Sequence, residues 1–545
     1  MKQILPLVGL FFLWSSQCLF AQHKLQEDWF NYTTYPDQLV IELNAPNAQW
    51  KQVSVTDCFT NAPLPFELLT DHTLQVKGLH PAQLVTVFAD VAEGENITHK
   101  EARLSTLSAS TGAMNVYFNH PVSLEWAQLQ SAVNLSNTLD DKLITYINAC
   151  QQTLDIAIYS SYAPSATTGI AGAINAAYNR GVQVRIVYDG SASTLMALLN
   201  TNIPTLPSPQ TSMYTIMHNK FVIFDARHTD ASVPYVWTGS TNWTTNQIEG
   251  PDKNNVIAIQ DQALALGYTL EFEEMWGGSG LTPNLTTSRF GTYKTDNTPH
   301  QYVIGGKIVN SYFSPSDGTN AKIKAAINTA NSDISVAVMN ITRSDISSAI
   351  ISKYNAGITN VNLLIDSQNP TSNQTPTFQA ALPATQVEVF TLSGIMHHKF
   401  MVVDNFNANS DPQVLLGSHN WSTSAETKND ENTLIVHDLN IANQYFQAFA
   451  YLFQLSGGQL AVPTAKNNAE IRCFPNPTAD RTTLVVPEHE GLITIQLQNV
   501  LGQILWQTKT TDSTIDIDLS AYNSGMYPLL IHSDSGSFVT KLVKK

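Results

Sequence analysis

Residues 216–225 read IMHNKFVIFD, and residues 395–404 read IMHHKFMVVD. Each copy holds a histidine, a lysine two positions later and an aspartate behind four apolar residues; these are His218, Lys220 and Asp225, then His397, Lys399 and Asp404. The apolar run indicates a buried strand. Because side chains two positions apart in a strand lie on the same face, each strand is expected to present an imidazole beside an ammonium.

The sequence around these two stretches also repeats. GSTNW at 239–243 recurs as GSHNW at 417–421, Asp155 matches Asp333 at the same offset of 178, and the two histidines are 179 apart. Apolar runs alternate with helical patterns, as in DIAIYS, TGIAGAINAAYNRG and VQVRIVYD, and this order predicts a βαβ unit in a largely parallel sheet. We therefore expect a duplicated α/β domain, with halves at 120–290 and 300–457 related by a pseudo-two-fold axis.

The repeated residue types suit a phosphodiester. Ammonium groups and amide donors neutralise charge on a transferring phosphoryl group, and an imidazole can attack phosphorus or protonate a leaving oxygen. The candidate phosphate-binding residues beside the lysines are Asn242, Asn420, Ser240 and Ser418. A zinc site is the competing interpretation of paired His and Asp, but HExxH is absent and each lysine would place a positive charge beside the metal. We expect neither a metal nor another cofactor.

The paired motifs resemble those of the phospholipase D superfamily, whose HKD motif occurs twice. The resemblance covers about 120–457, and AETKNDENTLIV at 425–436 is similar to a stretch in small bacterial nucleases of this superfamily. It implies α/β/α halves and a metal-independent, two-step reaction through a phosphohistidine. His218 and His397 would be nucleophile and general acid/base, and the two lysines and two asparagines would cradle the phosphate. Asp225 and Asp404 complete the catalytic motif, and we expect them to hold local structure.

In the family, an acidic residue after the GSxN element orients a catalytic histidine. Glu431 fits this role, and its counterpart at an offset of 178 is Lys253, so we expect the neighbouring Asp252 to substitute or one histidine to lack support. Family members typically cross this support between the halves. Glu431 would then activate His218 as the nucleophile, which leaves His397 as the general acid.

The two ends of the chain predict export. Residues 1–21 combine Lys2 with the apolar run 4–14 and read as a signal peptide. Alternating strands at 24–118 predict a fibronectin-like or immunoglobulin-like β-sandwich. Residues 470–545 predict a small β-sandwich and resemble the C-terminal sorting domain of type IX secretion cargo. That resemblance implies outer-membrane secretion machinery as a partner, and a secreted or cell-surface location in a Gram-negative bacterium.

Charge bears on the substrate. The 545 residues carry a net charge of −16, and residues 121–457 hold 15 Lys and Arg against 25 Asp and Glu, a net of −10. A nonspecific nuclease usually carries a basic strip, so a phospholipid head group is the favoured phosphodiester. An extracellular endonuclease acting on DNA or RNA is the first alternative, and a secreted binding protein with a vestigial site is the second. One chain holds both halves, which is compatible with a monomer.

Overall fold

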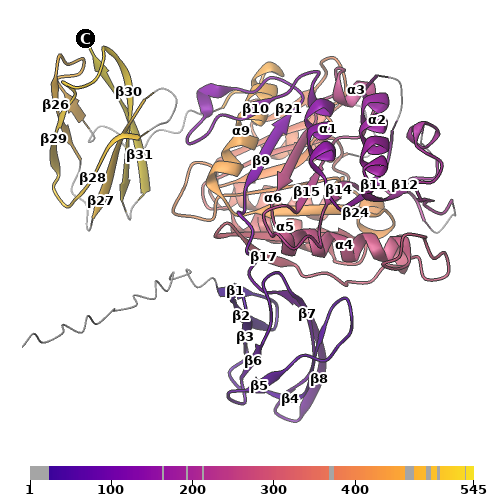
Figure 1. The fold of residues 1–545 in the computed structure, drawn as a ribbon. Coiled ribbons are helices and arrows are strands. Elements are labelled where there is room, and N and C mark those ends of the chain that lie inside the picture. The colour runs from indigo at the N-terminus through magenta and orange to yellow at the C-terminus, as the bar shows by residue number, and fades with distance from the viewer. Residues whose placement is uncertain are drawn as a thin grey trace, which may run out of the picture.

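The computed structural model describes residues 24–161, 165–191, 194–210, 214–367, 373–460, 472–486, 492–499, 504–533 and 536–545. The predicted signal peptide lies outside these residues. An N-terminal β domain, an α/β domain and a C-terminal β domain follow one another along the chain (Figure 1). Within the described ranges, no helix is both long enough and apolar enough to cross a membrane.

The N-terminal domain has two sheets, with strand orders β1-β2-β3-β6-β5 and β4-β7-β8, whose apolar side chains share one core. Its strands are β1 (Lys24–Gln26), β2 (Phe30–Thr34), β3 (Gln38–Leu43), β4 (Ala48–Asp57), β5 (Phe66–Leu68), β6 (Thr73–Lys77), β7 (Leu84–Glu93) and β8 (Asn96–Ser105). The strand β9 (Met114–Phe118), which we expected here, instead pairs with β16 (Asn255–Ile259). Its buried residues complete the α/β sheet, so the predicted boundary at 118 is too late.

Each half of the α/β domain is built on an eight-stranded sheet, and the two strand orders are equivalent: β10-β9-β16-β15-β14-β11-β12-β13 and β17-β18-β24-β23-β22-β19-β20-β21. The remaining elements of the first half are η1 (Leu124–Trp126), β10 (Val133–Asn134), α1 (Leu139–Ala149), β11 (Thr153–Ile158), α2 (Ser165–Asn179), β12 (Gln183–Tyr188), η2 (Leu195–Leu198), β13 (Thr205–Pro207), β14 (Lys220–Phe224), β15 (Tyr235–Gly239), α3 (Thr245–Ile248) and α4 (Gln262–Trp276). A connection containing η3 (Gly291–Tyr293) joins the halves. The second half contains β17 (Gln301–Ile304), β18 (Lys307–Ser314), α5 (Thr319–Thr329), β19 (Asp333–Val338), α6 (Ser344–Asn355), β20 (Asn360–Asp366), α7 (Thr375–Ala381), η4 (Ala384–Gln386), β21 (Val387–Phe390), β22 (Lys399–Val403), β23 (Gln413–Gly417), α8 (Thr423–Thr427), β24 (Glu431–Val436) and α9 (Leu439–Leu455).

The sheets are mixed rather than largely parallel. β11, β12 and β13 are parallel, whereas β14 runs antiparallel to β11 and to β15, and β15 runs antiparallel to β16. Only strands joined through a crossover are parallel, because the shorter connections after β14 reverse the chain. Consequently the beginning of β14 lies at the same sheet edge as the ends of β11 and β12.

The offset between equivalent residues varies along the chain. Ile158 pairs with Lys220 and Val338 pairs with Lys399, so β11 and β19 are related by 180 residues. At that offset Asp155 corresponds to Ser335, and its predicted match with Asp333 is wrong. Small length differences in the loops cause such shifts, and a constant offset cannot register them.

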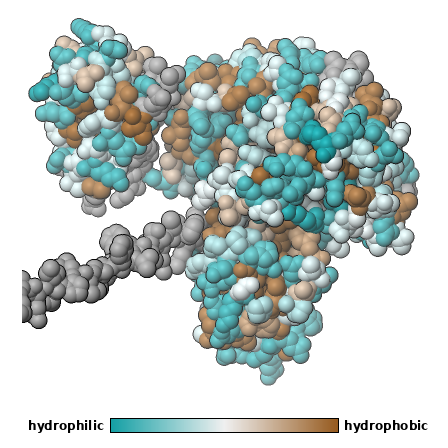
Figure 2. All heavy atoms as spheres, viewed as in Figure 1, coloured by the Kyte–Doolittle hydropathy of each residue, from teal (hydrophilic) through white to brown (hydrophobic). Residues whose placement is uncertain are grey.

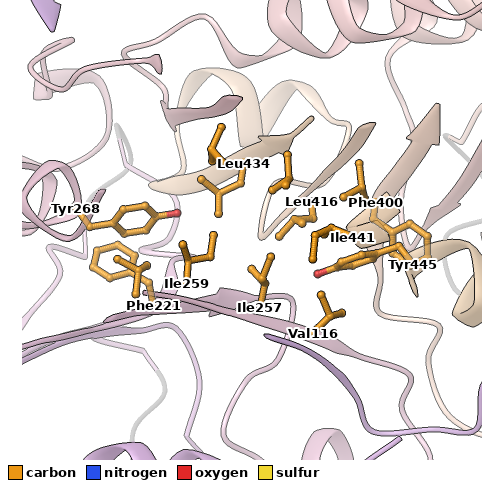
Figure 3. Close-up of a cluster of buried hydrophobic side chains, with 14 of the residues drawn as sticks. Val116, Phe221, Ile257, Ile259, Tyr268, Phe400, Leu416, Leu434, Ile441 and Tyr445 are labelled. Atoms are coloured by element: carbon orange, nitrogen blue, oxygen red, sulfur yellow. The ribbon is translucent and has the colours of Figure 1, made fainter. Parts of the chain in front are cut away.

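The two halves pack face to face through a shared apolar core that includes residues of α4 and α9. Figure 3 shows Phe221 and Ile257 of the first half facing Leu416 and Leu434 of the second. The helices α4 and α9 begin alike, since the side chain of the preceding aspartate accepts a hydrogen bond from a first-turn N–H in each. Separate clusters lie under α1 and α2 and under α5 and α6, which gives each half its α/β/α layers.

The C-terminal domain has its own apolar core, drawn from a three-stranded and a four-stranded sheet. Its strands are β25 (Arg472–Phe474), β26 (Arg481–Val485), β27 (Ile493–Gln498), β28 (Ile504–Thr510), β29 (Thr514–Asp518), β30 (Gly525–Ser533) and β31 (Gly536–Lys544). On the face seen in Figure 2, apolar residues of all three domains are interspersed with hydrophilic ones.

Candidate active site

The two HKD histidines stand immediately before β14 and β22, at the sheet edges where β11 and β19 end. Each is 5% exposed. Lys220 Nζ donates to the carbonyl of His218 at 2.6 Å, and Lys399 Nζ donates to the carbonyl of His397 at 2.8 Å. In each half burial lowers the pKa of the histidine most and the ammonium lies near enough to lower it further, which places imidazole and ammonium close together as predicted.

The two motifs also meet one another. The backbone N–H of His218 donates to Asp430 of the other half at 2.9 Å, and His397 donates to Lys253 at the same distance. Parallel bridges join Met217 to Asp430 and Lys253 to Met396. This reciprocal exchange between the halves is what a pseudo-two-fold axis requires.

Burial depresses the pKa of both motif lysines. Burial lowers the pKa of Lys220 to about 7. Burial, followed by the charge of Lys220, holds the pKa of Lys399 well below its usual range. An anionic group between the two ammoniums would relieve both effects, because opposite charge favours the protonated amine.

His218 carries a carboxylate partner from the second half. Its Nδ1 lies 2.7 Å from Oε2 of Glu431, which is fully buried and also accepts from Ser418 Oγ at 2.7 Å and Asn429 Nδ2 at 3.0 Å. Burial opposes ionisation of Glu431, but His218 outweighs it and holds the carboxyl pKa at about 2. Burial lowers the pKa of His218 to about 4, against the pull of Glu431. The crossed support expected for His218 is present.

His397 has an amide partner instead. Its Nδ1 lies 2.9 Å from Oδ1 of Asn254, an oxygen that also accepts from Ser240 Oγ at 3.0 Å. The first half has one residue more than the second between its GSxN element and β16, so Asn254, rather than Lys253, corresponds to Glu431. Asp252 accepts from the N–H of Ile395 at 2.8 Å and does not orient a histidine, which corrects that expectation. Burial, then the charge of Lys399, keeps the pKa of His397 well below its usual range.

Asp225 and Asp404 lie at the far ends of β14 and β22, away from the histidines. Asp225 accepts from the N–H groups of Gln151 and Thr153, at 2.8 and 2.9 Å, and Asp404 accepts from Ser332 N–H at 2.8 Å. Both aspartates adopt left-handed φ angles, +54° and +57°. They fasten the loops that enter β11 and β19, so they are outside the reacting centre although they belong to the motif.

The four phosphate-binding candidates divide into two kinds. The hydroxyls of Ser240 and Ser418 accept a strand N–H and donate to Asn254 and Glu431, so they position the histidine partners. The carboxamide oxygens of Asn242 and Asn420 are buried and have no hydrogen-bond partner among the described residues. The serine hydroxyls are thus engaged, whereas each of the two amides keeps an unpaired acceptor oxygen.

Several further residues contribute that the sequence did not single out. The Tyr159 ring lies 4.9 Å from Lys220 Nζ and 4.8 Å from the His218 ring, while Met339 Sδ contacts Lys399 Nζ at 3.7 Å in the equivalent place. Neither Tyr159 nor Met339 belongs to a repeated motif. Asn254 could have been found by aligning PDKNNV (251–256) with KNDENT (428–433). This alignment uses an offset of 177 instead of 178 and pairs Asn254 with Glu431.

The described residues contain one His/Asp grouping with the spacing of a metal site, Asp296, His300 and Asp317. It shares no residue with the two HKD motifs. His300 already lies 3.1 Å from Asp296, and these carboxylates raise its pKa to about 9 against the effect of burial. This grouping is therefore already paired as an ion cluster.

Two family models match this chain. Residues 143–276 and 323–453 match the family model described as cardiolipin synthase, PLD-like domain, and residues 472–545 match the secretion system C-terminal sorting domain. The chain is 27% identical over 139 residues to a phospholipase D of Rickettsia prowazekii, covering 26% of this chain and 64% of that protein. It is 29% identical over 140 residues to human mitochondrial cardiolipin hydrolase, covering 25% of this chain and 50% of the relative.

Among solved structures, a phosphatidylserine synthase of Haemophilus influenzae superposes with a TM-score of 0.43 and 12% identity, over 62% of this chain and 87% of that one. The matches to the phospholipase D and to the cardiolipin hydrolase each cover less than two thirds of that relative's length. Both HKD motifs fall inside the matched segments, and the tail match indicates a secreted or cell-surface protein. This chain belongs to the phospholipase D superfamily and ends in a secretion-system sorting domain.

Proposed function

We propose that this protein is a secreted phosphodiesterase that hydrolyses a phospholipid head-group ester through a phosphohistidine, without a metal. The observation that carries the proposal is the meeting of two His–Lys pairs from the two halves in one buried site. Two imidazoles and two ammonium groups meet there, and ammonium groups held close together favour an anionic ligand such as a phosphate.

His218 is the nucleophile in this reaction. Glu431 accepts a hydrogen bond from the protonated Nδ1, so Nε2 is unprotonated and its lone pair can attack phosphorus. Attack forms the P–Nε2 bond as the bond from phosphorus to the leaving oxygen breaks. The carboxylate then stabilises the positive charge that develops on the ring, which no group does as well beside His397.

His397 is the general acid and then the general base. It gives a proton to the leaving oxygen in the first step and takes one from water in the second, when the P–Nε2 bond breaks and a phosphomonoester forms. A neutral amide partner leaves its imidazolium a strong acid. The bound phosphate anion raises the pKa of His397 toward the range in which it can carry that proton.

The phospholipid assignment is supported by relatives named phospholipase D and cardiolipin hydrolase, and by the net charge of −10 on residues 121–457. An acidic surface repels nucleic acid unless a local basic strip offsets it. The sorting domain supports delivery by a secretion system to the cell surface or beyond.

The test is hydrolysis by the purified protein in EDTA, with phosphatidylethanolamine vesicles and single-stranded DNA assayed in parallel. The proposal expects lipid turnover, intact DNA, and loss of turnover in His218→Ala and His397→Ala. Cleavage of DNA with intact lipid would replace the proposal with an extracellular nuclease. Turnover of neither, with both variants indistinguishable from the parent, would support a binding protein with a vestigial site.

A further inference from the structure

A buried cluster of charged side chains includes Asp430, the residue that precedes Glu431, the partner of His218. The side chains of Lys294 and Asp430 are fully buried, with 3.6 Å between Nζ and Oδ1. Lys294 also pairs with Glu271 of α4 and donates to the carbonyl of Ser314 at 3.0 Å. Such a cluster is costly to bury unless each charge is paired and hydrogen-bonded.

Asp430 links this cluster to His218 along two routes. Its carbonyl accepts the N–H of His218 at 2.9 Å, and its own N–H donates to Ile216 at 3.1 Å. It also precedes Glu431, and adjacent strand residues point to opposite faces. Glu431 therefore reaches the imidazole while the Asp430 side chain reaches the ion cluster, so a shift of one moves the other.

The Asp430 carboxylate is held from three sides. Tyr214 Oη donates to Oδ2 at 2.6 Å, and the N–H of Gly291 donates to Oδ1 at 2.7 Å. Gly291 has φ +55°, and a Cβ there would lie 2.7 Å from the Tyr214 ring and 2.9 Å from the Lys428 carbonyl. Gly291 and Lys294 both come from the connection between the halves, which thereby supports the nucleophile of the first half through a strand of the second.

The equivalent place beside His397 lacks this cluster. Lys253 occupies it, makes the same backbone contacts and is only half-buried. Its ammonium donates to the carbonyl of Pro251 rather than to a buried carboxylate. Among the described residues near the two histidines, a fully buried carboxylate–ammonium pair is thus found on the side that carries the proposed nucleophile.

We propose that Asp430 and Lys294 are positioning residues, which fix the Asp430–Glu431 peptide so that His218 stays in the Nδ1-protonated tautomer with Nε2 facing phosphorus. This inference rests on the proposed function for its rate consequences. Burial raises the pKa of the Asp430 carboxyl, and the Lys294 ammonium counters that shift by favouring the charged form. Removing Lys294 therefore favours a neutral, less tightly held Asp430.

Rapid-quench kinetics on bis(4-nitrophenyl) phosphate test the inference. Nitrophenolate leaves without help from an acid, so the burst of product reports attack by His218 alone. Asp430→Asn and the charge-balanced Lys294→Met/Asp430→Asn are expected to lower the burst rate constant at least tenfold with little change in KM. Asp430→Asn keeps the size of the side chain. The double variant removes one positive and one negative charge, and without Lys294 burial favours the neutral form of Glu271, so each variant is designed to fold.

The matched control is Asp155→Asn. Asp155 belongs to a buried carboxylate–cation pair of the first half, in which its carboxylate accepts from Arg185 at 2.7 and 2.8 Å. It is expected to lower the melting temperature but leave the burst rate constant unchanged. If Asp430→Asn behaves like this control, losing only burst amplitude or melting temperature, the cluster is merely structural and the inference fails.

A second readout does not need activity. Selective ¹⁵N labelling of histidine distinguishes a protonated Nδ1 from a bare one by chemical shift. The parent is expected to show His218 protonated at Nδ1, and Asp430→Asn to show exchange between tautomers. An unchanged His218 spectrum in that variant would overturn the inference, whereas absence of turnover in the parent would count against the proposed function alone.

Discussion

The two halves of the α/β domain share their strand order, their paired His–Lys strands and even the capping of equivalent helices. They differ at the groups around each imidazole. His218 has a carboxylate on Nδ1, a tyrosine ring beside it and an ion cluster behind it, whereas His397 has an amide, with a methionine at the position of the tyrosine.

This difference separates the features that the duplicated backbone gives to both halves from those that depend on the side chains of each half. In the proposed reaction, phosphate binding needs two equivalent sets of cationic groups, and the repeated backbone positions them. Nucleophile and acid need opposite electrostatic environments, because one must carry developing positive charge and the other must release a proton. A change of one side chain, carboxylate to amide, is enough to separate them.

The largest test of this division is to remove each imidazole. On a lipid ester, His218→Ala is expected to lower kcat/KM by about 10⁴-fold or more and His397→Ala by about 10²–10⁴-fold. On bis(4-nitrophenyl) phosphate, His397→Ala keeps phosphoenzyme formation and traps it, because only the second step needs the base. Acid-labile phosphate found on His397 in a His218→Ala protein would reverse the assignment.

Exchanging the partners should move the pH profile. As a general acid, His397 works only when protonated, so activity falls as pH rises through its pKa, which burial keeps low. Asn254→Asp places an opposite charge on Nδ1 and should raise that pKa by about 1–3 units, moving the alkaline limb up equally. The measurement is kcat/KM as a function of pH. An alkaline limb that does not move would mean that His397 is not the general acid.

The converse change is the matched control. His218 must be neutral to attack, so activity falls as pH falls through its pKa, at about 4 in the free protein. Glu431→Gln removes the attraction that favours the imidazolium, so the pKa falls and the acid limb moves to lower pH. The alkaline limb should stay in place.

Much of this comparison could be predicted from the sequence, because strand motifs with fixed internal spacing survive any change in loop length. The crossed pairing of Glu431 with His218 was predicted and is confirmed. Asn254 was missed because one extra residue precedes β16, and a constant offset pointed to Lys253. β9 was misplaced because a buried strand reads the same in either sheet, and its pairing with β10 and β16 is what assigns it.

The motif aspartates give a smaller and purely structural effect. Asp225→Ala leaves the N–H groups of Gln151, Gln152 and Thr153 without their acceptor, and each such donor costs about 1–3 kcal/mol. We expect the free energy of unfolding to fall by several kcal/mol in urea melts, up to about three times the single-donor figure. kcat/KM per folded molecule should stay within about twofold, because Asp225 is at the far end of β14. A large loss of kcat/KM in fully folded protein would place Asp225 in the chemistry after all.

The smallest effect is expected from the aromatic that distinguishes the halves. Tyr159→Met gives Lys220 the neighbour that Lys399 already has, and removes a ring 4.9 Å from the ammonium. A cation–π contact of this kind is worth about 0.5–2 kcal/mol, so kcat/KM should fall between about twofold and thirtyfold. Met339→Tyr is the reciprocal variant. If it raises activity on the same substrate, a second ring serves the site as well as the first does. If it lowers activity, the site needs one aromatic and one flexible side chain, and the asymmetry extends from the chemistry to the fit of the substrate.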